Sequence, residues 1–164
     1  VYYSNDKRTS FQTNGYANFA DIPTYDNLIE SMKGHDAVLV MAAGNQDFKV
    51  PGIQSLIALN EEINDRVIIA GDIDLKRNFE SYTTNNAGTI CLELNEQGTC
   101  ASEQRISDRY LLAPGTDIIG ADKNGNYRPN SGTSMSAPTI SGAVAILRQM
   151  WPHMYGGNIA QILL

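Results

Sequence analysis

The chain has 164 residues, of which 42% are hydrophobic, and this length suits one hydrophobic core and one domain, not two. Its 18 acidic and 12 basic residues give a net charge of −6, and the basic residues are scattered. This balance argues against nucleic acid or an anionic membrane as a partner. The chain has no run of 18 or more apolar residues. Residues 1–6 form neither a signal peptide nor a starting methionine, so we expect the chain to begin inside a domain.

The amino-terminal part of the chain predicts a loop, a helix and a strand. Residues 1–20 are polar without an apolar period, and we expect an exposed extended segment there. A helix should open at Pro23 and stop at Gly34. Residues 37–43 are apolar throughout, which predicts a parallel strand buried on both faces.

The middle of the chain predicts a turn with a short helix at residues 51–59 and a second buried strand at residues 67–70. Short strands are expected at residues 110–113 and 117–121, before a polar turn at residues 123–126. This order of elements predicts an α/β fold with a mostly parallel sheet and flanking helices.

Two cysteines, Cys91 and Cys100, lie in one polar stretch. A hairpin-like loop closed by a disulfide is one interpretation and two unpaired thiols is the other, because sequence alone does not establish geometry. A bridge would indicate an oxidising compartment. No histidine lies nearby, so the pair fits none of the usual zinc patterns and we expect no metal site.

Ser134 is the leading candidate for a catalytic residue. It lies in Gly-Thr-Ser-Met-Ser-Ala-Pro at residues 132–138, where a helix is predicted to begin. A serine hydroxyl is a weak nucleophile until a base removes its proton and donors stabilise the resulting oxyanion. The first turn of a helix offers unpaired N–H groups and the positive end of the dipole. Apolar residues downstream recur at helical spacing, which predicts a buried helix: Ile140, Val144, Leu147 and Trp151.

Four blocks of this sequence, in order, resemble those of the subtilisin-like serine peptidases. They are Ala-Ala-Gly-Asn at residues 42–45, Val-Ile-Ile-Ala-Gly at 67–71, Leu-Ala-Pro-Gly at 112–115 and the serine block at 132–138. The serine block does not match the nucleophile-elbow motif of α/β-hydrolases, because Ser136 occupies the position at which that motif requires glycine. The resemblance implies that residues 1–164 form the carboxyl-terminal portion of one subtilisin-like catalytic domain.

Asn45 is the second candidate, because it follows a buried strand and its side-chain amide can project at the carboxyl edge of the sheet. It could equally be a turn residue beside glycine. In the subtilisin-like family the matching asparagine donates to the oxyanion together with the serine backbone N–H. By the same resemblance, the substrate pocket would be lined by Met41, Ala42, Ala43, Gly44 and Thr133.

A serine of this type needs a histidine base and a carboxylate that orients the imidazole. The only histidines, His35 and His153, lie outside the family's histidine motif, and we expect both to be ordinary surface residues. Asp72 also ends an apolar strand, but Ile73 follows it where the family's catalytic aspartate precedes Ser-Gly or Thr-Gly, and Asp74 matches a non-catalytic position. The family order then implies that the catalytic Asp and His lie upstream.

The end of the chain is expected to begin a helix at residues 157–164, capped by Asn158 and continuing past Leu164. A sheet cut through its middle exposes an edge and an apolar face, which favours a homodimer or exchange of elements.

The sequence predicts a serine endopeptidase that hydrolyses proteins or peptides and is inactive as this chain alone. The alternative is a non-catalytic relative that serves as a binding or structural module, and the missing half could also be a second polypeptide. No cofactor is required. Many family members use calcium for stability, but no calcium site is identifiable here. The loop cysteines and the Ser-Ala-Pro triplet look similar to bacterial surface subtilases, including autotransporters, so we expect a secreted or cell-surface protein with no membrane contact from this segment.

Overall fold

The structure is a computed structural model that describes residues 23–76, 79–80, 84–92, 95–97 and 99–164. The loop expected at residues 1–20 lies outside this part of the chain. The predicted first helix is confirmed as α2, Pro23–Gly34. The short helix expected at residues 51–59 is a 3₁₀ helix, Ile53–Leu59.

A four-stranded sheet forms the centre of the molecule, with β2 (Val67–Asp74) as its middle strand. It pairs in parallel with β1 (Leu39–Ala42) on one side and with β4 (Tyr110–Pro114) on the other. The short β3 (Phe79–Glu80) adds an antiparallel extension to the end of β2. The predicted α/β fold with a mostly parallel sheet is therefore confirmed.

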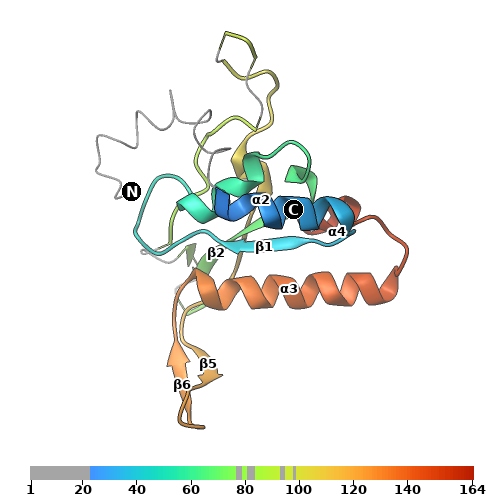
Figure 1. Cartoon of the computed structure of the whole chain (residues 1–164). Helices are drawn as coiled ribbons and strands as arrows, with labels where there is room; N and C mark the ends of the chain where they lie inside the picture. The colour runs from blue at the N-terminus through green and yellow to red at the C-terminus, as the bar shows by residue number, and fades with distance from the viewer. Residues whose placement is uncertain (1–22, 77–78, 81–83, 93–94, 98) are drawn as a thin grey trace.

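Helices cover both faces of this sheet (Figure 1). Helix α2 and the 3₁₀ helix lie on one face, while α3 (Thr133–Met150) and α4 (Gly156–Leu163) lie on the other. Side chains of β2 alternate between the two layers: Val67 and Ile69 join the first core, and Ile68 and Ala70 join the second. All four are completely buried, and each valine or isoleucine contributes roughly 1.5–3 kcal/mol by leaving water.

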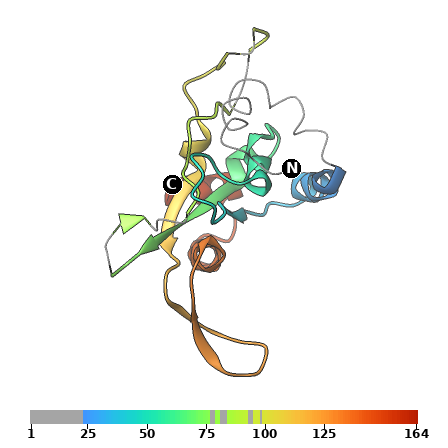
Figure 2. The same ribbon diagram turned by 90° about the vertical axis from the view of Figure 1, so that its left-hand side faces the viewer.

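A β-hairpin projects from this body beyond the start of α3 (Figure 2). It consists of β5 (Ile118–Ala121) and β6 (Tyr127–Asn130), which pair antiparallel around the predicted turn at residues 123–126. The expected strand at residues 117–121 thus belongs to a separate two-stranded sheet. Strand β6 was not predicted, because Tyr-Arg-Pro-Asn has no apolar alternation and contains a proline, which sheets tolerate at edges.

Three expectations about the elements were wrong. Strand β1 is half-buried along its length, not buried, because among the described residues it pairs only with β2. Helix α3 is not buried all round, since Ile146 is 60% exposed and Met150 59%. Helix α4 begins at Gly156 instead of at an Asn158 cap, and the Gly156 N–H donates to Asp36 Oδ1 at 2.6 Å. Cys91 and Cys100 form a disulfide, so of the two interpretations left open by the sequence the bridged one is correct.

Candidate active site

Ser134 is the second residue of α3 and its side chain is exposed. Because it lies in the first turn, its backbone N–H has no acceptor within the helix. Gly132 precedes the helix with φ 134°, a conformation that L-residues with a side chain rarely adopt. A Cβ at Gly132 would lie 3.0 Å from Asn45 Nδ2, so glycine permits the close approach of Asn45.

Asn45 and Gly44 are joined to the first residue of α3 by two reciprocal hydrogen bonds. The Thr133 backbone N–H donates to Asn45 Oδ1 at 2.8 Å, and the Gly44 N–H donates to Thr133 Oγ1 at 3.1 Å. The first bond occupies the amide oxygen of Asn45 and leaves its Nδ2 hydrogens as donors. No described residue accepts a hydrogen bond from Nδ2, and the Asn45 side chain is exposed. An oxygen bound beside Ser134 could therefore receive these donors.

Residues at the end of β4 and just after it hold the first turn of α3 through two hydrogen bonds. Ser136 is completely buried and its hydroxyl donates to the carbonyl of Ala113 at 3.0 Å. The Gly132 N–H donates to the carbonyl of Gly115 at 2.8 Å. These two bonds explain why an Ala-Pro-Gly block accompanies the serine block in the sequence: the two segments fix the backbone around Ser134.

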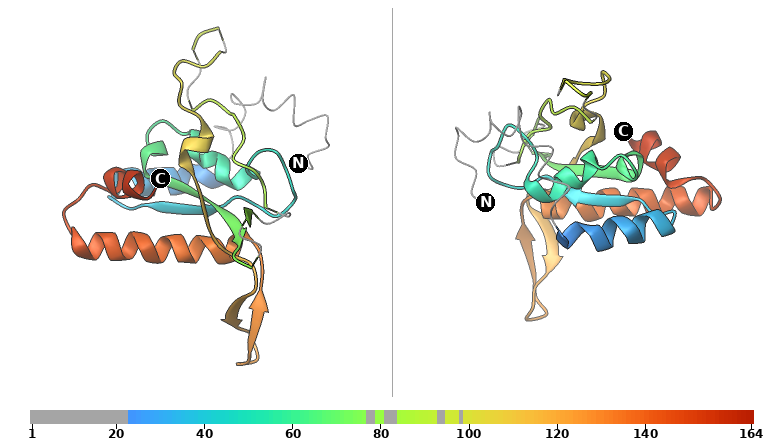
Figure 3. Two further views of the ribbon diagram at one scale, coloured as in Figure 1. Left: turned by 180° about the vertical axis from the view of Figure 1, so that it is seen from behind. Right: turned by 45° about the horizontal axis from the view of Figure 1, so that its top comes forward.

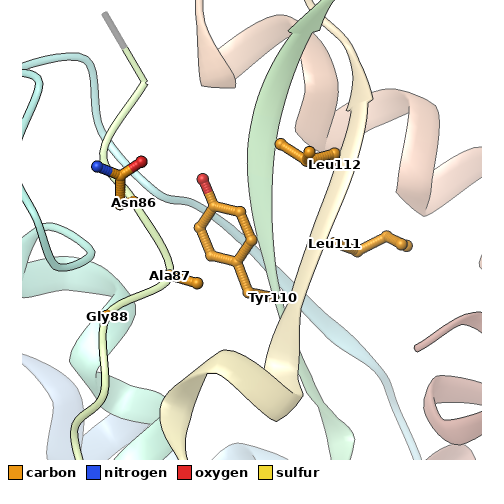
Figure 4. A pocket seen from close by; sticks show the side chains of 6 residues that line it. All are labelled: Asn86, Ala87, Gly88, Tyr110, Leu111 and Leu112. Carbon is orange, nitrogen blue, oxygen red and sulfur yellow. The ribbon is translucent and has the colours of Figure 1, made fainter. Parts of the chain in front are cut away.

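The expected substrate-pocket residues follow one another along β1 into the loop that carries Asn45. Met41 and Ala42 are half-buried at the end of β1, Ala43 is completely buried, and Gly44 adopts φ 100°. Of these, the structure brings Gly44 directly to Thr133. A hollow of about 550 Å³ lies elsewhere (Figure 4), lined by Asn86, Ala87, Gly88, Tyr110, Leu111 and Leu112. It includes none of the predicted site residues.

Neither histidine lies near Ser134. His35 is exposed, and its Nδ1–H donates to the Ser31 carbonyl at 2.9 Å. Its neighbour Asp36 pairs with Arg148 at 3.1 Å, fourteen residues along α3 from Ser134 and so about 21 Å away at 1.5 Å per residue. His153 is exposed beyond the carboxyl end of the same helix. His35 follows the carboxyl end of α2 and His153 follows that of α3, and these two helix ends lie on the same side of the molecule, away from the start of α3 (Figure 3).

Asp72 is a buried carboxylate at the end of β2, with no exposed surface. The Thr116 hydroxyl lies 3.2 and 3.1 Å from the two carboxylate oxygens of Asp72. The backbone N–H of Asp72 donates to Thr84 Oγ1 at 3.1 Å. These contacts join the end of β2 to two neighbouring loops.

Asn85 is a residue of the site that the sequence did not reveal. It is completely buried and binds the loop at residues 43–48 through its side chain. An asparagine in a stretch of Thr-Thr-Asn-Asn is typical of an exposed turn, so no pattern marked it as an interior residue.

None of the helices in the described ranges is both long and apolar enough to cross a membrane. In the same ranges, no group of three or more His, Cys, Asp or Glu side chains could hold a metal ion.

A parallel sheet that presents a serine at the start of a helix, beside an asparagine amide, is the architecture of one class of serine peptidase. The Subtilase family model matches residues 6–164. The chain therefore belongs to the subtilase family, as its sequence blocks predicted.

Individual relatives agree with this assignment. Subtilisin-like protease 10 of Arthroderma otae is 45% identical over 76 residues, covering 41% of this chain and 18% of that protein. The intracellular serine protease of Paenibacillus polymyxa is 24% identical over 92% of this chain and 39% of its own length. The C5a peptidase of Streptococcus pyogenes serotype M1 is 28% identical over 82% of this chain but 12% of its own length. The chain thus spans well under half of each of these relatives.

Solved structures share the fold. The patellamide maturation protease PatA superposes with a TM-score of 0.59 at 24% identity, over 84% of this chain and 43% of that one. The self-cleaved protease domain of PatA gives a TM-score of 0.58 at 21% identity, over 98% of this chain and 62% of that one.

Proposed function

We propose that this chain is the carboxyl-terminal part of the catalytic domain of a serine endopeptidase. Ser134 is the nucleophile, and Asn45 Nδ2 together with the Ser134 backbone N–H forms the oxyanion hole. The observation that carries the proposal is the 2.8 Å hydrogen bond from the Thr133 N–H to Asn45 Oδ1, which occupies the amide oxygen at the helix start and leaves Nδ2 as the donor end of the side chain.

The chemistry of these groups is acyl transfer. The Ser134 oxygen attacks the peptide carbonyl carbon while a base takes its proton, and the carbonyl oxygen becomes an oxyanion. The base then gives the proton to the leaving amine, and water hydrolyses the acyl-enzyme by the same route. This series of reaction steps needs no cofactor, and the substrates are proteins or peptides.

The base and the carboxylate that orients it come from a segment upstream of residue 1. Both histidines of this chain lie near the carboxyl end of α3, whereas Ser134 lies at its amino-terminal end, and this separation supports this part of the proposal. So does an uncharged, exposed face of α3 that begins at the active-site end of the helix: Pro138, Ser141, Gly142, Ala145, Ile146 and Gln149. The upstream segment packs on this face and along the edge of β1 that faces away from β2. Without it the chain is inactive, because loss of the base removes most of the rate acceleration.

The protein acts outside the cell or on its surface, as bacterial surface subtilases do. The disulfide between Cys91 and Cys100 supports this location, since such bridges persist in oxidising compartments. Two of the family relatives are named as intracellular proteases, so the location needs its own test by fractionation of the source cells. The isolated chain dimerises or exchanges elements through the surfaces that the upstream segment otherwise covers.

A fluorophosphonate probe tests the proposal, because it reacts only with serines that are activated as nucleophiles. We expect the complete protein to be labelled, with the adduct mapped to Ser134 by peptide mass spectrometry, and Ser134→Ala to abolish the label. Ser141→Ala is the matched control, since Ser141 is an exposed serine two turns along the same helix. A folded complete protein that takes no label at Ser134 would instead be the non-catalytic module.

A further inference from the structure

The buried side chain of Asn85 uses all of its hydrogen-bonding capacity on one loop. Its Oδ1 accepts from the N–H groups of Gln46 and Phe48 at 2.9 and 3.0 Å, and its Nδ2 donates to the Ala43 carbonyl and to Gln46 Oε1 at 2.9 and 3.0 Å. Two acceptor sites and two donors are the whole inventory of an asparagine amide. Its partners lie on both sides of Asn45, so Asn85 closes the loop that presents the Asn45 side chain.

This loop has a backbone that needs external support. Gly44 and Asp47 adopt positive φ values of 100° and 53°, so the loop cannot continue the hydrogen-bond ladder of β1. The Asn85 N–H supplies a further bond to the Gly44 carbonyl at 2.9 Å. A Cβ on Gly44 would overlap Asn85 Nδ2, so the asparagine amide packs directly on the backbone next to Asn45.

Asn85 is itself held from the opposite side. The Tyr110 hydroxyl donates to the Asn85 carbonyl at 2.5 Å. Figure 4 shows the Tyr110 ring projecting from the start of β4 toward the segment that follows Asn85. The adjacent Thr84 accepts a hydrogen bond from the backbone N–H of Asp72 on β2 at 3.1 Å. Asn85 therefore connects two strands of the rigid sheet to the loop of Asn45.

We propose that Asn85 is a positioning residue for catalysis: it holds the loop at residues 43–48 so that Asn45 Nδ2 points at the oxyanion formed at Ser134. This inference rests on the proposed function of Asn45. A donor misplaced by about 1 Å loses much of its effect on the transition state, so a change at Asn85 acts on kcat without any contact with substrate.

The test uses the complete protein and compares kcat and KM for a peptide substrate. Asn85→Asp preserves the size of the side chain but removes both donors, and Tyr110→Phe removes the hydroxyl that anchors the Asn85 carbonyl and contacts Thr84 Oγ1 at 3.4 Å. We expect kcat to fall about 10–100-fold in Asn85→Asp and less in Tyr110→Phe, with KM changed less than about threefold. Asn95→Asp is the matched control, because Asn95 makes a similar set of bonds in an exposed loop remote from Ser134.

The decisive comparison repeats both variants in an Asn45→Ala background. If Asn85 acts through Asn45, neither variant lowers kcat further once the donor is gone. An equal fall in both backgrounds would show that Asn85 only stabilises the fold, and would overturn the inference. Should Asn85→Asp fail to fold, Tyr110→Phe alone carries the same comparison.

A readout independent of activity separates this inference from the proposed function. In the complete protein labelled with ¹⁵N-asparagine, the Asn45 side-chain amide signal is identified by its loss in Asn45→Ala. We expect Asn85→Asp and Tyr110→Phe to shift it, and Asn95→Asp to leave it in place. Shifts of this signal without peptidase activity would reject the proposed function, whereas an unmoved signal in an active enzyme would reject the role of Asn85.

Discussion

Asn45 Oδ1 accepts a hydrogen bond from the Thr133 backbone N–H at 2.8 Å, across 88 residues of sequence. The bond joins the loop after β1 to the first turn of α3, and it is answered by the bond from the Gly44 N–H to Thr133 Oγ1. An asparagine held in this way cannot rotate its amide without losing the bond, because its nitrogen cannot accept from Thr133. The relationship fixes which end of Asn45 faces the space beside Ser134.

Replacing Asn45 with alanine should remove one oxyanion donor. For the complete protein we expect kcat to fall about 10²–10³-fold, the loss measured for such a donor in subtilisin itself, with KM nearly unchanged. Steady-state kinetics with a chromogenic peptide measures both constants. Asn126→Ala, an exposed asparagine in the hairpin turn, is the control and should match the unaltered protein. A kcat within threefold of the parent in Asn45→Ala would contradict the assigned role.

Thr133→Val tests how much the buried hydroxyl of Thr133 contributes to the stability of the fold. The substitution is close to isosteric, but it leaves the Gly44 N–H facing a methyl group inside the protein. We expect a loss of about 1–3 kcal/mol in the free energy of unfolding, measured by urea denaturation. Thr139→Val on the same helix should change this free energy by less than about 0.5 kcal/mol, because Thr139 is exposed. Equal effects of the two variants would mean that the buried hydroxyl contributes nothing.

Gly142→Ala tests whether the exposed face of α3 is covered in the complete protein. A Cβ at Gly142 meets no atom within 4 Å, so alanine should stabilise the isolated chain by about 1 kcal/mol through helix propensity. In the complete protein the same methyl group should disturb the packed upstream segment and lower the melting temperature. Thermal denaturation of both forms measures the two effects. Stabilisation in both would indicate that this face stays in solvent.

The carboxylate of Asp36 should stabilise the chain at neutral pH, and this stabilisation should be lost in acid. Burial raises the pKa of its carboxyl, but the hydrogen bond from the Gly156 N–H and the pairing with Arg148 outweigh this effect, and the pKa lies below its ordinary value. A lowered folded-state pKa contributes stability that is present above the unfolded value of about 3.9 and is lost as pH falls through the folded pKa.

Asp36→Asn should therefore lower the melting temperature at pH 7 by about 3 °C, which corresponds to about 1 kcal/mol, and the difference should shrink as pH falls below the unfolded value of about 3.9 and through the folded pKa. Glu61→Gln, a change to an exposed acidic residue, should leave the melting curves unaltered at every pH. A difference that is constant from pH 7 to pH 2 would exclude the carboxylate as its source.

Much of the fold followed from the sequence because its strands are short apolar runs bounded by turn residues. Strand β2 and helix α3 were predicted near their observed positions, and so was the polar turn at residues 123–126, whereas the sequence left the disulfide open. Strand β6 was not, because only its pairing with β5 makes Tyr-Arg-Pro-Asn a strand. Burial was misjudged for β1 and α3, since apolar residues show what a surface could cover and not whether its partner is present.

The site, like the fold, could be predicted from the sequence only in part. Ser134 and Asn45 were proposed from the sequence because each belongs to a recognisable block beside an expected element boundary. Asn85, which supports the loop of Asn45, and Asp36, which binds the start of α4, are polar side chains that only tertiary contacts distinguish from ordinary surface residues. A side chain that acts by satisfying another segment's backbone leaves no periodic pattern in its own segment.

If Ser134 attacks the peptide bond, its replacement removes the attacking oxygen, and the kcat of Ser134→Ala in the complete, folded protein measures this loss directly. We expect hydrolysis of a peptide substrate to fall by about 10⁶-fold, to the residual rate that binding and the oxyanion hole sustain alone. Ser141→Ala, which changes an exposed serine two turns along the same helix, is the control and should retain the parent kcat. Hydrolysis by Ser134→Ala at the parent rate would show that another group attacks the peptide bond.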